Sequence, residues 1–186
     1  MEEVAEEALV SRATAYRHFR SVDALLLEAP IDAAVADPVE LFANDTSDDV
    51  EARVDRAEAS LHEVVYRSEP QLRVLLANSI GRDTADETVP RRQNRRVPLI
   101  QAALAPSRHR LRDADYERLC AALAVFFGPE SMIVFRDVLG VDGEAARAVK
   151  SWAVRALVRA ALESSEAEST PLEATSVEPA DRKGGG

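Results

Sequence analysis

Hydrogen-bond donors are concentrated between Ser11 and Arg20, near the start of the chain. This segment contains three arginines and no acidic residue, although the whole chain has a formal net charge of −10. Guanidinium groups donate to guanine edges and phosphates, while hydroxyl, phenol and imidazole groups fit phosphate oxygens. Such chemistry suits the DNA major groove. The candidate contact residues are Arg12, Thr14, Tyr16, Arg17 and His18.

Two short helices joined by a tight turn are expected to position these donors. Val4, Ala5 and Ala8 give the first helix a narrow apolar face that another helix can approach closely. Ser11 fits the N-cap of the second helix, because its hydroxyl can accept from a backbone N–H one turn later. Ser21 can cap a third helix. A plainer interpretation of the second helix is a short amphipathic helix with a solvated charged face.

The string VAEEALVSRATAYRHF closely resembles the helix-turn-helix of TetR-family transcriptional regulators. The family pattern runs Val-Ala-x-x-Ala-Gly-Val-Ser-x-x-Thr-x-Tyr-x-His-Phe, and the matching residues are Val4, Ala5, Ala8, Val10, Ser11, Thr14, Tyr16, His18 and Phe19. The resemblance implies a homodimeric, all-helical, ligand-responsive repressor. It also implies that the five donors named above contact DNA, with Tyr16 and His18 mainly on phosphates.

The chain departs from this pattern at three points. Leu9 replaces the turn glycine, where a positive φ is expected and is costly for a branched side chain. Val22 replaces a lysine that often opens the third helix. The family also places a helix before the motif, so we expect a truncated head that binds DNA poorly.

Composition and periodicity predict an all-α protein. The 186 residues suffice for a small head on a larger body, and little of the sequence alternates at period two. The single cysteine, Cys120, cannot form an internal disulfide, which fits a reducing cytoplasm. No apolar run approaches the roughly 20 residues of a membrane span. We therefore expect a cytoplasmic protein without a membrane partner.

Three segments are predicted along the chain. Residues 1–36 are expected to form a truncated helix-turn-helix DNA-binding domain, and residues 37–163 a helical effector-binding and dimerisation domain. Residues 164–186 are expected to form a disordered tail. Pro30 is expected to kink or end the third helix, because proline removes a helical hydrogen bond. Apolar stripes predict further helices over residues 50–69, 70–80, 113–127 and 143–163.

Several breaks and loops are expected between these helices. Residues 44–49 and 81–89 are polar and typical of loops, and the first loop, which ends at Asp49, finishes in capping residues suited to a helix start. Gly128-Pro129 should break a helix, while Gly140 fits a C-cap and Asp142 the next N-cap. An arginine cluster after Pro90 could attract an anionic ligand or DNA, or it could be a solvated face paired with nearby acids. Its members are Arg91, Arg92, Arg95 and Arg96.

The sequence favours neither an enzyme nor a metalloprotein. His18, His62 and His109 are scattered, without metal-ligand spacing. There is no phosphate-cradling glycine loop and no nucleophile elbow. Cys120 lies in an apolar helical face, which favours an inert core thiol over a reactive one. No cofactor is expected.

A small, mostly apolar effector is expected between the helices from Val50 to Phe127. Aromatic and aliphatic side chains would enclose it, and a few polar groups would orient it. Ordinary core packing explains each of these side chains equally simply. The predicted pocket residues are His62, Tyr66, Asn78, Leu104, Tyr116 and Phe127.

A homodimer is expected to form through segments 113–139 and 143–163, with Trp152 at or near the interface. Small residues on the last helix allow close helix packing, either inside the monomer or against a second copy. The predicted interface residues are Leu119, Ala122, Ile133, Trp152, Ala153, Ala156 and Leu157. The predicted function is a ligand-responsive transcriptional regulator, a repressor that binds operator DNA as a homodimer through its helix-turn-helix. The alternative is a dimerising or ligand-sequestering relative that has lost DNA binding.

Overall fold

Helices connected by short turns make up the described part of the chain. The computed structural model describes residues 1–19, 21–80 and 94–169, and these residues contain no strand. The all-α prediction is therefore confirmed. The α-helices are α1 (Glu2–Glu7), α2 (Arg12–His18), α3 (Val22–Ala34), α4 (Pro38–Phe42), α5 (Val50–Arg67), α6 (Glu69–Ile80), α7 (Arg96–Leu104), α8 (Asp113–Phe126), α9 (Pro129–Ile133) and α10 (Gly143–Ser169). A 3₁₀ segment η1 (Ala105–Arg110) and a π-helical turn η2 (Val134–Val138) complete the order.

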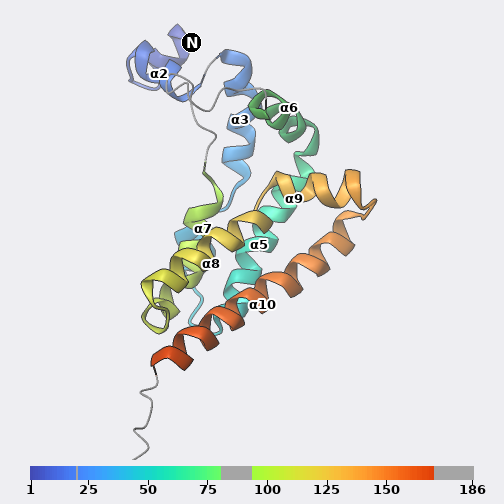
Figure 1. The fold of residues 1–186 in the computed structure, drawn as a ribbon. Helices are drawn as coiled ribbons and strands as arrows, with labels where there is room; N and C mark the ends of the chain where they lie inside the picture. Colours follow the sequence, from blue (N-terminus) through green and yellow to red (C-terminus); the bar gives the residue numbers. More distant parts are fainter. Residues whose placement is uncertain (20, 81–93, 170–186) are drawn as a thin grey trace, which may run out of the picture.

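The first two helices lie at one end of the molecule, and α3 runs from them toward the remaining helices (Figure 1). We call α1 and α2 the head, and α4 to α10 the body. Beside α3 lies α6, while the long α10 runs along the body far from the head. The position of α3 makes it the connection between head and body.

The core of the body is built around α5. Its apolar stripe, at three- and four-residue spacing, buries Val54, Ala57 and Leu61 completely or nearly so. This stripe packs against α7 and α10. Partners from the surrounding helices are Leu99, Ile100, Ala103, Leu104, Leu119, Leu123, Val154 and Val158.

The predicted caps and breaks of the body helices are found in the structure. Asp49 accepts from the Ala52 N–H at 3.0 Å, and Asp142 accepts from the Ala145 N–H at 2.8 Å. Gly140 has a φ of +64°, a conformation that glycine adopts without steric cost. Asp49 and Asp142 therefore begin α5 and α10, and Gly140 lies in the turn that precedes α10.

The break between α8 and α9 depends on a close approach to Gly128. A Cβ atom there would lie 2.6 Å from Arg96 Nη2, so any larger residue would displace that side chain. Arg96 donates to the Ala124 carbonyl and to Glu130 Oε2, both at 2.8 Å. It thereby satisfies a free carbonyl at the end of α8 and joins it to α9.

Of the two effects predicted for Pro30, a kink or an end of the helix, the end does not occur, because α3 continues to Ala34. One helix boundary differs from the sequence prediction. α10 extends past the expected end near Glu163 to Ser169. Ser165, predicted to lie in a disordered tail, is buried and donates to Asp115 Oδ2 at 2.9 Å. Arg110 Nη2 also donates to Glu166 Oε1 at 2.6 Å. Long-range polar contacts, which apolar periodicity does not predict, thus hold this part of α10.

Candidate nucleic-acid interface and internal cavity

The head has the geometry of two short helices packed through small residues. Ala5 of α1 and Ala15 of α2 are buried, and the two helices are in contact. Ser11 caps α2, accepting from the Thr14 N–H at 3.0 Å, while the two hydroxyl groups lie 2.8 Å apart. The predicted cap therefore fixes the orientation of α2.

Four of the five predicted contact residues of α2 are accessible to solvent. Arg12, Tyr16 and Arg17 are exposed, and Thr14 is partly exposed. Arg12 lies 5.9 Å from the centroid of the Tyr16 ring, and its Nη1 is 3.8 Å from Glu2 Oε1. The prediction for the side chain of His18 falls outside the described residues.

Leu9 forms the turn between α1 and α2 and has a φ of +53°, the value expected for the glycine it replaces. Its side chain is 94% exposed, so packing contributes little at this position. A left-handed conformation costs roughly 1–2 kcal/mol for a residue with a Cβ atom. The backbone of the turn is therefore strained at Leu9, directly before α2.

An ion pair joins α3 to the body beside a cavity. Arg95 Nε donates to Asp32 Oδ1 at 2.5 Å, and its Nη2 lies 3.4 Å from Glu28 Oε2. Arg96 pairs with Glu130 as described above. For Arg95 and Arg96, pairing with nearby acids is therefore confirmed, whereas Arg91 and Arg92 lie outside the described residues.

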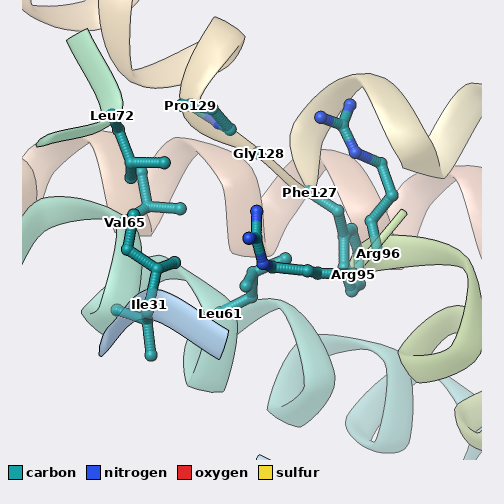
Figure 2. A pocket seen from close by; sticks show the side chains of 10 residues that line it. Ile31, Leu61, Val65, Leu72, Arg95, Arg96, Phe127, Gly128 and Pro129 are labelled. Atoms are coloured by element: carbon teal, nitrogen blue, oxygen red, sulfur yellow. The ribbon is translucent and has the colours of Figure 1, made fainter. Parts of the chain in front are cut away.

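Apolar side chains and two arginines line the cavity beside Arg95, as Figure 2 shows. Its volume is about 30 Å³, space for roughly one or two water molecules. The Arg95 guanidinium points toward the middle of the labelled side chains, whereas that of Arg96 points away from them. The lining residues are Ile31, Leu61, Val64, Val65, Leu72, Arg95, Arg96, Phe127, Gly128 and Pro129.

One member of the predicted effector set, Phe127, lines this cavity. His62 and Tyr66 stack on each other elsewhere on α5, with ring centroids 4.2 Å apart. Asn78 is exposed on α6, and Leu104 belongs to the core. Tyr116 lies against the Arg108 guanidinium, 4.3 Å from its ring centroid. The structure does not gather these six residues around one space.

Sequence reasoning missed Ile31, Leu61 and Leu72 as cavity residues. Each lies on the apolar face of its helix, where core and pocket side chains follow the same spacing. A different signal marks Glu58 and Lys150, which interrupt the apolar stripes of α5 and α10. A charged residue inside such a stripe predicts burial against an opposite charge.

Glu58 and Lys150 form a buried ion pair between α5 and α10, with both side chains about 1% exposed. Arg147 Nη1 lies 3.4 Å from Glu58 Oε2, and its Nη2 donates to Asp55 Oδ1 at 2.6 Å. Burial raises the pKa of Glu58 and lowers the pKa of Lys150, while their mutual attraction opposes both shifts. Each of the two charged groups carries a desolvation cost that the other mainly offsets, and Arg147 adds a second positive charge beside Glu58.

His62 lies beside this ion pair and is kept neutral. Burial, followed by the charges of Lys150 and Arg147, lowers the pKa of His62 to about 4. Its Nδ1 is 4.0 Å from Glu58 Oε1. A further titratable group, Cys120, is partly buried, and burial raises the pKa of its thiol. This shift disfavours the reactive thiolate.

The predicted dimer residues divide between the core and the surface of a single chain. Leu119 and Ala153 are buried, whereas Trp152 is 73% exposed. Ala122, Ile133, Ala156 and Leu157 are partly exposed. A largely apolar groove of about 190 Å³ runs between α8 and α10, lined by Leu119, Ala122, Leu157, Ala160 and Ala161 among others.

The residues that the structure describes contain neither a metal-ligand cluster nor a single membrane-spanning helix. Across 1–19, 21–80 and 94–169, no three His, Cys, Asp or Glu side chains gather as a metal site. Within these ranges no single helix is long and apolar enough to cross a membrane. Together, the consecutive segments Asp113–Phe126 and Pro129–Val138, which are bent by 46° relative to each other, have the length and apolar composition of a membrane span.

Comparison with known proteins gives a family match at the N-terminus of the chain. Residues 1–29 match the family described as "Bacterial regulatory proteins, tetR family". The matched segment contains α1, α2 and the first part of α3. Neither a curated protein nor a solved structure matches the chain.

Proposed function

Because the N-terminal segment of the chain is that of a TetR-family transcriptional regulator, we propose that the protein represses transcription as a ligand-responsive homodimer bound to operator DNA. The family match over residues 1–29 is the observation that carries this proposal. We assign DNA binding to residues 1–36 and effector binding and dimerisation to 37–163.

The surface of α2 supports a DNA-binding role. Arg12, Tyr16 and Arg17 are exposed on one short helix whose start is fixed by the Ser11 cap. Arginine can pair with guanine in the major groove, and the hydroxyl groups of Thr14 and Tyr16 can reach phosphates. Although the chain is acidic as a whole, these cations face outward at one end.

Selection of bound duplexes from a random-sequence DNA pool tests this role. A homodimer with two recognition helices should enrich a two-fold symmetric sequence, with half-sites separated by about one helical turn or a multiple of it. The enriched sequence also supplies the operator for later measurements. Recovery of no enriched motif by the folded protein would count against DNA recognition.

The exposed apolar side of α8 and α10 supports dimerisation. Trp152 and Val149 of α10 and Val125 of α8 are exposed in the single chain, and a largely apolar groove lies between the same two helices. Exposed apolar clusters of this kind mark protein interfaces more often than ordinary surface. A second copy would cover the same residues on both subunits by two-fold symmetry.

Light scattering on an Ala156→Arg variant tests the proposed interface. The bulky charge should weaken a close helix contact, because an unpaired charge is costly to bury. Ala77→Arg is the control, since Ala77 is exposed on α6. We expect the wild type and the control to have dimeric mass and Ala156→Arg to shift toward monomer. Monomeric mass in all three would remove dimerisation from the proposal.

A further inference from the structure

Arg95 contributes to the linings of two spaces. One is the cavity of about 30 Å³ described above. The other is a hollow of about 270 Å³, lined by Asp32, Val35, Ala36, Asp37, Pro38, Arg95 and Pro98. Because Arg95 belongs to both linings, a movement of its side chain away from Asp32 would change both spaces at once.

The contacts of α3 with the body converge on the same place. Ile31 is the one fully buried side chain among those described for α3, and it forms a wall of the inner cavity. Glu28 and Asp32 hold Arg95 from the same helix face, at positions three residues before and one residue after Ile31. A ligand that displaced Ile31 and the Arg95 side chain would therefore break both the apolar contact and the ion pairs that hold α3 against the body.

We propose that these two spaces form a binding site for a small amphipathic acid, whose carboxylate replaces Asp32 and Glu28 on Arg95. This inference rests on the proposed function and specifies the chemistry of its effector. The apolar part of the ligand would pack against Leu61, Val65 and Phe127 in place of Ile31.

Charge exchange makes an acid more suitable than a neutral ligand. The Arg95 side chain is only 17% exposed and already holds carboxylates, so a ligand carboxylate keeps its guanidinium paired. A neutral ligand that separated Arg95 from Asp32 would leave a partly buried cation without a partner. Arg96 does not take this role, because its guanidinium is held by Ala124 and Glu130.

The same exchange would bias the position of α3. With the ligand bound, Glu28 and Asp32 lose their shared cation and face a like charge, which favours their movement into solvent. Ligand binding therefore stabilises one arrangement of α3 over another, as a conformational response requires. Because α3 follows α2 directly, its movement changes the placement of the recognition helix.

The test uses octanoate, decanoate and 1-naphthoate as probes, each beside its neutral amide, with binding measured by calorimetry. Wild-type protein should bind at least one acid about tenfold more tightly than its amide, the preference expected for one charged hydrogen-bonded pair. Arg95→Gln should abolish that preference. Arg67→Gln is the matched control, because Arg67 is exposed on α5, and it should retain the preference.

A second variant keeps the test informative if Arg95→Gln folds poorly. Asp32→Asn removes a competitor for Arg95 and should tighten binding of the acid by about tenfold while leaving amide binding unchanged. Equal binding of acids and amides by the wild type, or weaker acid binding by Asp32→Asn, would overturn the inference. Operator binding by the free protein is measured separately, so loss of the acid site and loss of DNA recognition are distinguishable.

Discussion

Glu58 and Lys150 are almost completely removed from water, and each is the main compensation for the other's charge. Removing one partner should leave a buried charge and lower the free energy of unfolding by about 3–5 kcal/mol. Replacing both, as Glu58→Leu with Lys150→Met, should cost much less because no uncompensated charge remains. Urea unfolding of the two single variants and the double variant measures this difference. Additive losses in the double variant would show that the two residues are not energetically coupled.

The environment of His62 predicts a pH dependence of stability. Its folded pKa of about 4 lies below its ordinary value of 6.5, so the unfolded chain binds the proton more readily. The contribution of neutral His62 is intact above about pH 6.5 and falls as the pH decreases toward 4. Lys150 and Arg147 oppose its protonation, while Glu58 is the nearest acid.

A His62→Asn variant isolates this dependence. Between pH 7 and pH 4.5, the wild type should lose more unfolding free energy than the variant, by at most about 3 kcal/mol. Denaturant unfolding across this pH range gives the two curves. Parallel curves would show that His62 titrates with the same pKa in the folded and unfolded states.

At the level of single residues, the sequence predicts best those positions whose conformation depends on neighbouring residues in the chain. Ser11 was identified as a cap, and Leu9 was expected to adopt the positive φ that is found. The pairing of Arg95 with Glu28 and Asp32 spans more than 60 residues, so no local pattern could specify its partners. Local geometry was therefore predictable, whereas long-range ion pairs were not.

The strained turn between α1 and α2 gives a prediction at the level of elements. Leu9→Gly should stabilise the head by about 0.5–1 kcal/mol, because glycine relieves the left-handed strain at some entropic cost. Leu9→Ala is the matched control, since alanine keeps the strain and the exposed leucine side chain packs little. Hydrogen exchange of the Val10 and Ala15 amides should slow only in the glycine variant. Equal exchange in the two variants would exclude a backbone effect.

Helix boundaries are predictable from the sequence where caps act locally and less so where tertiary contacts dominate. Asp49 and Asp142 begin their helices as expected. In contrast, the apolar periodicity of α10 ends near Glu163, but the helix continues to Ser169 and Ser165 holds it against α8. This difference lies where the local signal favours a helix end.

In the whole molecule, head and body are connected through a helix with few attachments. Among its described side chains, α3 buries Ile31 and contributes Glu28 and Asp32 to the pairing with Arg95. The sequence predicted a head, a helical body and a mostly apolar effector, but not the space in which the effector would bind. That space is assembled from α3, α5, α6, α7 and the α8–α9 break, whose proximity depends on the complete fold.

DNA recognition by α2 is tested most directly by the salt dependence of operator binding. Fluorescence anisotropy with the selected duplex, from about 50 to 200 mM salt, should show affinity falling linearly on logarithmic axes. Arg17→Ala should weaken binding and reduce the slope by about one, whereas Arg67→Ala on the exposed surface of α5 should change neither. Salt-independent binding, or equal effects of the two substitutions, would contradict recognition through α2.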